Sequence, residues 1–324
     1  MSENSLKIAL YGVGSMGSFH ARVISENPRC TLAYIVDNDV ESAYQVSNQY
    51  GATQLKNNGE ILAVDGVVIA TPTDTHFEIA RSYLESGIPV LVEKPISRNF
   101  HEVKMLIELA KMKKVTFKCG FVERFNPVVI KALEIVRAPI HFASVRHSPY
   151  VPRIHTPVTG DLLIHDLDIC IQIFEKDGMP RISSAVPAAK SGQTSSSLQM
   201  INLTLVFPNQ HSASLSASRL DHQKKRSIQI FEEDRTLELD LLQKTIAIYR
   251  SVSNQTIEKG LGDQLQTIIE IPQLQYAHEP LAAQFENFLN CIFEYNTENE
   301  ELDLLSYRSV HDLISIVDEG VLCD

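Results

Sequence analysis

One segment near the N-terminus constrains the fold more than any other part of the chain. An apolar run, Leu6–Tyr11, is followed at once by the glycine loop Gly12-Val13-Gly14-Ser15-Met16-Gly17. A helix-like segment from Ser18 to Asn27 and a second apolar run, Thr31–Val36, then lead to Asp37. This order, with about twenty residues between the last glycine and the acid, is the pattern of a βαβ unit that binds a dinucleotide.

The residue types in the loop explain why this pattern suits a dinucleotide. Gly12 permits a tight turn after the strand, Gly14 lets the backbone approach a pyrophosphate, and Gly17 lets helix and strand pack closely. The N–H groups around Ser15 and Met16, together with the positive end of the helix dipole, face the phosphates. We therefore expect these five residues to bind the cofactor NAD.

The acid at the end of the second strand predicts which dinucleotide is preferred. Asp37 is expected to accept hydrogen bonds from the adenosine ribose, and Asp39 adds negative charge nearby. Because these carboxylates repel a 2′-phosphate, we expect NAD to bind more tightly than NADP.

Composition limits the class of protein. At 324 residues the chain is long for one compact core and suits two domains. Its formal net charge of −11 argues against nucleic acid or an anionic membrane as a partner. No apolar run is long enough to span a bilayer, and the N-terminus has no signal-peptide pattern. The five cysteines form no C-x-x-C pair, which is typical of reduced thiols in a cytoplasmic protein, and we expect no metal site.

Apolar strands alternate regularly with helical patterns up to about residue 121. We expect strands at 66–70, 89–92 and 115–119, helices at 40–50, 75–86 and 100–113, and a short helical turn at 61–63. Continuous apolar runs of this kind are typical of parallel strands that are covered on both faces. The fold class is therefore α/β, and residues 1–121 should form a Rossmann domain with a doubly wound parallel sheet.

The pattern changes after residue 121. We expect helices at 127–136, from about 161, at 280–294 and at 304–317, a strand at 140–147, and a proline-rich loop at 148–159. Between 182 and 250 the chain alternates apolar and polar residues in short runs, at 200–206, 212–218, 227–231, 237–241 and 245–249. Residues 122–324 should form an α+β domain on a large, mostly antiparallel sheet with one face toward solvent or a partner. A ligand cleft between the two domains is expected.

Glu93-Lys94-Pro95 follows a predicted buried strand at its carboxyl end, where open α/β sheets bind their ligands. A solvated surface lysine is the ordinary alternative, but the buried strand before Lys94 and the proline after it favour a site. Beside a nicotinamide, the Lys94 ammonium would hydrogen-bond a reacting oxygen and stabilise an alkoxide as it forms.

Asp161 and His165 lie four residues apart at the start of a predicted helix, and Asp168 lies close to the same face. A histidine with a carboxylate one turn before it suits general base catalysis, because its ordinary pKa lies near neutrality. A helix-terminal acid beside a structural histidine explains the same pattern. The residues alone leave both interpretations open.

The segment Thr71-Pro72-Thr73-Asp74-Thr75-His76 follows the third core strand and enters a helix. Asp74 or Thr75 is a candidate N-cap for that helix. His76 lies in the first turn and either faces the cofactor or is a surface residue.

Four motifs occur in order along the chain: the glycine loop, Ala70-Thr71-Pro72-x-x-x-His76, Glu93-Lys94-Pro95 and Asp161-x-x-x-His165-Asp166-x-Asp168. Over essentially its whole length the chain resembles the glucose–fructose oxidoreductase/inositol dehydrogenase (Gfo/Idh/MocA) family. The resemblance implies that Lys94 and His165 flank the reacting carbinol, with Asp161 beside them. It further implies a homodimer or homotetramer formed through the open sheet. The cofactor-binding residues that we assign beyond the glycine loop and Asp37 are Thr71, Pro72, His76, Glu93 and Lys94.

One local stretch narrows the expected substrate. Glu123-Arg124-Phe125-Asn126-Pro127 is similar to a stretch in family members that oxidise the 3-hydroxyl of UDP-N-acetylglucosamine. Glu123, Arg124 and Asn126 are therefore candidate substrate contacts, as is Arg153 in a proline-stiffened loop, since arginine suits a diphosphate. The ordinary alternatives are an interdomain salt bridge for Arg124 and a solvated position for Arg153.

The predicted function is NAD-dependent oxidation of a secondary hydroxyl of a sugar or sugar nucleotide. The alternatives are a small-polyol (inositol-like) dehydrogenase, a glycosidase that uses bound NAD for transient oxidation, and a non-catalytic NAD-binding sensor. The presence of Lys94, Asp161 and His165 together favours an enzyme over a sensor.

Overall fold

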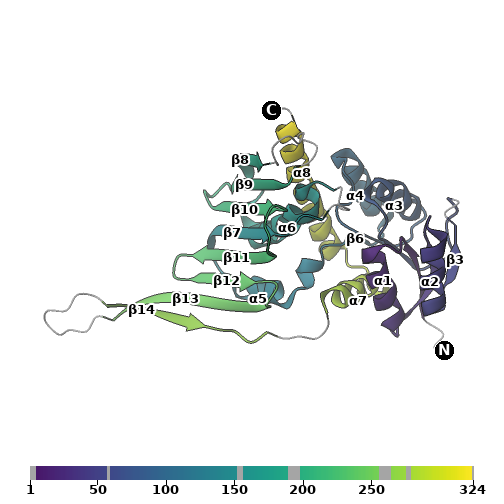
Figure 1. Cartoon of the computed structure of the whole chain (residues 1–324), viewed down its shortest axis with the longest axis horizontal. Coiled ribbons are helices and arrows are strands. Elements are labelled where there is room, and N and C mark those ends of the chain that lie inside the picture. Colours follow the sequence, from purple (N-terminus) through teal and green to yellow (C-terminus); the bar gives the residue numbers. More distant parts are fainter. Residues whose placement is uncertain are drawn as a thin grey trace. The chain divides into compact units, whose positions relative to one another are not determined.

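The chain forms two compact units in the computed structural model, which describes residues 5–56, 59–151, 156–188, 198–254, 264–274 and 279–322 (Figure 1). Met1–Val122 and His278–Ser315 form the first unit, and Glu123–Ala277 and Ile316–Asp324 form the second. The predicted boundary near residue 121 lies next to this division. Residues 280–315, which the sequence pattern places in the second domain, instead cluster with the first unit.

The first unit is built on a parallel sheet with strand order β3-β2-β1-β4-β5-β6. Its strands are β1 (Leu6–Tyr11), β2 (Cys30–Val36), β3 (Thr53–Leu55), β4 (Gly66–Ile69), β5 (Val90–Val92) and β6 (Phe117–Cys119). Its helices are α1 (Ser15–Glu26), α2 (Val40–Tyr50), α3 (His76–Glu85), α4 (Phe100–Lys113), α7 (Pro280–Phe293) and the larger part of α8 (Thr297–Leu322). The predicted doubly wound sheet is confirmed.

Helix α7 joins the first unit because its apolar face completes the core of that unit. Phe285, Phe288 and Leu289 are fully buried and belong to one apolar cluster with Ile8 of β1 and Ile24 of α1. Removing this apolar surface from water favours the association, although the helix follows the whole second sheet in sequence.

The second unit contains a sheet with strand order β14-β13-β12-β11-β7-β10-β9-β8, which forms the long ladder in Figure 1. Its strands are β7 (Pro139–His147), β8 (Arg181–Ala188), β9 (Met200–Val206), β10 (Ser212–Ser218), β11 (Lys225–Glu232), β12 (Thr236–Asp240), β13 (Thr245–Asn254) and β14 (Gln264–Glu270). Helices α5 (Pro127–Ile135) and α6 (Ile164–Ile173) pack against it. Among the described strands of this sheet, only β7 and β10 pair in parallel, so the predicted mostly antiparallel sheet is confirmed.

Several local predictions were wrong. Residues 61–63 form no helical turn. Strand β3 was missed because its sequence, Thr-Gln-Leu, is short and polar, as suits an edge strand. Strand β14 lies beyond the alternating region that we identified, and α8 begins at Thr297 rather than near Leu304.

Within the described residues, no helix combines the length and the apolar character that crossing a membrane requires.

Candidate active site

The glycine loop has the geometry that its sequence requires. Gly12 adopts φ +89°, and a Cβ atom there would lie 2.6 Å from the carbonyl oxygen of Ala70. A Cβ atom at Gly17 would lie 2.0 Å from the carbonyl oxygen of Gly12, so only glycine allows α1 to start this close to the loop. At Gly14, by contrast, a Cβ atom would meet nothing within 4 Å. Backbone at this position is therefore open to a ligand.

Helix α1 begins at Ser15, three residues earlier than the predicted Ser18, so Gly17 lies inside the helix. Gly14 is its N-cap and provides no capping side chain, and the first turn holds no acid. The first N–H groups of a helix need partners from outside it, and a phosphate supplies them. The loop therefore fits the pyrophosphate of NAD.

A cavity of about 410 Å³ adjoins this loop. Its lining includes Gly12, Gly14, Asp37, Thr71 and Pro72, all of which we predicted to bind the cofactor. Asp37 also fixes the loop, because its Oδ2 accepts a hydrogen bond from the Val13 N–H at 2.6 Å. Asp39 is the N-cap of α2 and accepts from the N–H groups of the first turn.

The segment after β5 is held from several sides of the first unit. Lys94 is half-buried and joined to Pro95 by a cis peptide bond. The Glu93 carboxylate is buried and lies 2.8 Å from Nε2 of His20, a residue of α1. Ile96 donates its backbone N–H to Nε2 of His311 in α8, over 3.0 Å.

His76 is 1% exposed, so the surface alternative for this residue is wrong. Its ring lies between two loops, with Nδ1 3.0 Å from the carbonyl oxygen of Pro95 and Nε2 2.9 Å from that of Thr71. Burial lowers the pKa of His76, and the neutral ring donates to one of these oxygens at a time.

Neither candidate cap of α3 acts through its side chain. Thr75 donates its hydroxyl to Thr71 and to the carbonyl oxygen of Pro72, both at 2.8 Å. Asp74 pairs with Arg98 at 3.3 Å. Both side chains are thus used to hold the loop after β4 rather than the helix.

In the second unit, Asp161 lies in a π-helical turn, Thr159–Leu163, that precedes α6 and its residue His165. The helical segment therefore begins before Asp161, the residue near which we predicted its start. Its first turn is a π-helical turn, a feature that is frequently found at functional sites. Oδ2 of Asp161 accepts a hydrogen bond from Nη2 of Arg219 at 2.6 Å. Arg219 was not predicted, because it follows β10 in sequence and meets Asp161 only in the folded unit.

The other acids of α6 form buried ion pairs. Asp168 receives two hydrogen bonds from Arg124, from Nε at 2.8 Å and from Nη2 at 2.5 Å. Asp166 pairs with Arg146, whose side chain is fully buried. Because Arg124 and Asp168 both belong to the second unit, this pair is not the interdomain salt bridge that we considered.

Two further predicted substrate residues also have internal partners. Glu123 is 7% exposed and accepts from Arg146 at 2.9 Å and from Arg226 at 3.3 Å. Asn126 is the N-cap of α5 and donates to Glu123 at 3.0 Å. Arg153 lies outside the described residues.

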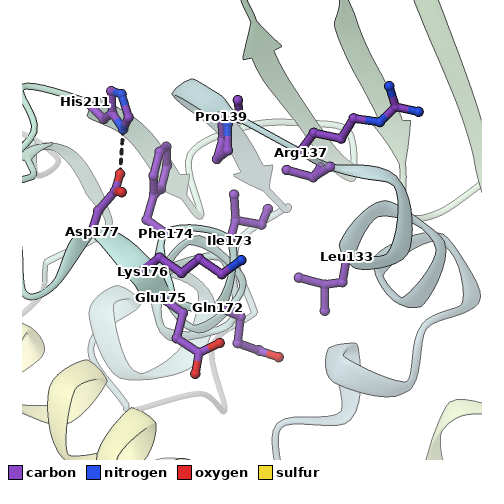
Figure 2. A pocket seen from close by; sticks show the side chains of 12 residues that line it. Leu133, Arg137, Pro139, Gln172, Ile173, Phe174, Glu175, Lys176, Asp177 and His211 are labelled. Atoms are coloured by element: carbon purple, nitrogen blue, oxygen red, sulfur yellow. Dashed lines mark hydrogen bonds and ion pairs between the residues drawn. The ribbon is translucent and has the colours of Figure 1, made fainter.

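A second cavity, of about 560 Å³, lies at the other end of α6 from His165 (Figure 2). Figure 2 shows the Asp177 carboxylate hydrogen-bonded to the His211 ring, over 2.5 Å, while Lys176 extends across the cavity. None of the predicted site residues lines this cavity.

The fold of the first unit and the open glycine loop define a Rossmann domain that fits a dinucleotide. Accordingly, the model of the oxidoreductase family with an NAD-binding Rossmann fold (Gfo/Idh/MocA) matches residues 6–121 of the chain. The predicted resemblance to this family and the predicted cofactor, NAD, are confirmed by this match.

Similarity to one relative extends over most of the chain. UDP-N-acetylglucosamine 3-dehydrogenase of Acidithiobacillus ferrooxidans is 28% identical over 295 residues, which make up 89% of this chain and 88% of that protein. A solved structure of the enzyme of that name from the same organism has a TM-score of 0.85 at 27% identity and covers 99% of both chains. The scyllo-inositol 2-dehydrogenase (NAD(+)) of Bacillus subtilis is 28% identical over 182 residues, 52% of this chain and 53% of that protein. These relatives confirm the predicted enzyme class, a dehydrogenase that acts on CH–OH groups.

Proposed function

We propose that this protein oxidises the 3-hydroxyl of UDP-N-acetylglucosamine to a 3-keto sugar, with NAD as the hydride acceptor. The observation that carries the proposal is the similarity to a UDP-N-acetylglucosamine 3-dehydrogenase along both units, at 27% identity and a TM-score of 0.85. In sequence, relatives named for inositol oxidation match a smaller share of the chain, as the Bacillus subtilis protein does at 52%. A solved myo-inositol dehydrogenase structure from Corynebacterium glutamicum covers 94% of the chain, but at 22% identity and a TM-score of 0.72.

In the proposed reaction His165 accepts the proton of the substrate hydroxyl. Lys94 hydrogen-bonds the same oxygen and stabilises its developing negative charge. Asp161, which Arg219 holds, lies four residues before His165 and orients the sugar or the histidine. The glycine loop would hold NAD, which would supply the acceptor for the hydride of the carbinol carbon.

The proposal is tested by a coupled assay, because a 3-keto sugar is unstable and a partner aminotransferase would consume it. Wild-type protein with UDP-N-acetylglucosamine, NAD and such an aminotransferase should produce NADH. Lys94→Ala and His165→Ala should each reduce turnover about 10²–10⁴-fold and leave NAD binding nearly unchanged.

Three outcomes would contradict the proposal. NADH formation with inositol or glucose and none with UDP-N-acetylglucosamine would identify a small-polyol dehydrogenase. Release of free sugar without net NADH would identify a glycosidase. NAD binding without turnover of any of these substrates would identify a sensor.

We further propose that the protein is cytoplasmic and forms a homodimer or homotetramer. Support for the location comes from Cys30, Cys119, Cys170 and Cys291, which are thiols rather than disulfides, as expected in a reducing compartment. Support for assembly comes from one face of the 8-stranded sheet, where side chains that alternate with buried ones are half-buried or exposed and could contact a second copy. They include Ala143, Ser214, Ser216 and Gln229. Light scattering on the purified protein measures the mass, and a monomer would contradict this part.

A further inference from the structure

Three buried histidines contact the short segment Glu93–Ile96, which we call the lysine segment. They are His20, His76 and His311, with exposed fractions of 0%, 1% and 3%. They come from α1, α3 and α8, so the chain brings them together from three separate helices of the first unit. Three nearly fully buried histidines around one loop are unusual, because histidine side chains are on average only partly buried.

Each histidine binds a different group of the lysine segment. His20 donates from Nε2 to the Glu93 carboxylate at 2.8 Å. His76 has Nδ1 3.0 Å from the carbonyl oxygen of Pro95. His311 accepts from the N–H of Ile96 at 3.0 Å. The contacts lie immediately before and immediately after Lys94, and none of them uses the Lys94 side chain.

The hydrogen bonds of His311 fix its tautomer. Nδ1 lies 2.7 Å from the carbonyl oxygen of Tyr307, which can only accept, so Nδ1 carries the proton. Nε2 is then a lone-pair acceptor for the N–H of Ile96. Burial lowers the pKa of His311 to about 4, so the ring keeps this arrangement at neutral pH.

We propose that His20, His76 and His311 form a clamp that holds the lysine segment and thereby positions Lys94 for hydride transfer. This inference rests on the proposed role of Lys94. The physical basis is that a catalytic group must be held closely, since a misplacement of about 1 Å can reduce a rate 10²-fold. The histidines are positioning residues, which act on the reaction through Lys94.

Substitutions at His311 test the clamp. His311→Leu removes the acceptor for the Ile96 N–H, whereas His311→Gln can place an amide oxygen near the position of Nε2. We expect kcat to fall about 10–100-fold in His311→Leu with KM for NAD unchanged, and to recover to within about threefold of wild type in His311→Gln. Leu289→Ala is the matched control, because it removes buried volume from the same unit without removing a hydrogen bond to the lysine segment. It should lower the melting temperature and leave kcat unchanged.

A double variant shows whether His311 acts through Lys94. If it does, His311→Leu combined with Lys94→Ala should be no slower than Lys94→Ala alone. If the fold-reductions in kcat of the two single variants multiply in the double variant, the proposal is wrong. It is also wrong if His311→Leu has the wild-type kcat. If His311→Leu does not fold, His20→Leu takes its place with the same expected outcomes.

A readout without turnover separates this inference from the proposed function. Hydrogen exchange of the peptide that spans residues 93–99 should be at least tenfold faster in His311→Leu and unchanged in Leu289→Ala. Unchanged exchange in His311→Leu would overturn the clamp even if the enzyme were active. An undiminished rate in Lys94→Ala would instead contradict the proposed function.

Discussion

Arg219 Nη2 lies 2.6 Å from Oδ2 of Asp161 and 2.7 Å from the carbonyl oxygen of Thr156. Since Arg219 is only 3% exposed, it fixes the Asp161 carboxylate from inside the second unit. The planar guanidinium of arginine presents its N–H donors in a fixed geometry, so it is well suited to orienting a carboxylate. This relationship holds the Asp161 carboxylate in one orientation, and its role in the site stays a prediction.

Arg219→Ala should therefore impair turnover. We expect kcat with the sugar nucleotide to fall about 10–100-fold and the affinity for NAD to stay within about twofold. Arg219→Lys should not restore the rate, because an ammonium cannot reproduce the guanidinium geometry. Arg250→Ala, which breaks a 3.6 Å pair with Glu270 at the other end of the sheet, is the control and should retain full activity. Steady-state kinetics measure all three variants.

We expect cofactor preference to depend on Asp37. At about 4 Å and an effective dielectric constant of ~20, one unit charge pair repels by roughly 4 kcal/mol, which solvent reduces. We expect NAD to bind at least about tenfold more tightly than NADP, and Asp37→Asn to narrow that ratio. Asp39→Asn keeps a good N-cap for α2 and should change the ratio less. Titration calorimetry compares the cofactors, and equal affinities in the wild type would refute the assignment.

Stability should fall in acid because of His311. Its pKa is about 4 in the folded chain against an ordinary value of 6.5, so the unfolded chain binds more protons between these values. Lowering the pH below 6.5 therefore reduces the free energy of unfolding, and this reduction reaches roughly 3 kcal/mol near pH 4. Burial lowers the pKa of His76 as well, which adds to the effect in the same direction.

Urea unfolding at several pH values measures this dependence. His311→Gln has no titrating ring at this position and should lose less stability than the wild type between pH 6.5 and pH 4. If both proteins show the same loss, His311 is not the source of the acid sensitivity.

Glu123 is expected to support the second unit rather than to bind substrate. Burial opposes its ionisation, but Arg146, Asn126 and Arg226 together outweigh burial and keep the Glu123 pKa below its ordinary value. Glu123→Ala leaves the fully buried Arg146 with one carboxylate fewer and should cost about 3–5 kcal/mol of stability. Glu123→Gln retains an amide oxygen and should cost less.

Thermal unfolding and kinetics together separate the two roles of Glu123. A lower melting temperature with KM for the sugar nucleotide unchanged agrees with a structural role. A wild-type melting temperature with a raised KM would restore the substrate contact that the sequence suggested.

Long periodic segments were predicted well from sequence. The glycine loop, the buried strands β1, β4 and β5 and helix α4 lie where their patterns place them, because apolar periodicity and glycine stereochemistry are local properties. The start of helix α8, by contrast, depends on contacts with residues that are distant in sequence. Its first turns are acidic and gave no apolar signal, yet Glu300 and Asp303 pair with Lys118, a buried residue of β6, at 2.8 and 2.7 Å.

The sequence by itself determined the cofactor class, the two kinds of sheet and the residues Lys94, Asp161 and His165 as candidates, since each depends on short spacings that the backbone enforces. Only the tertiary structure revealed that Arg219 holds Asp161, that Glu123 and Arg124 are used in internal ion pairs, and that three histidines surround the lysine segment. Such contacts join residues far apart in the chain. The sequence does not indicate which residue will pair with a given charged group or histidine ring. The partner is the residue that the folded chain places within hydrogen-bonding distance, because buried polar groups need partners.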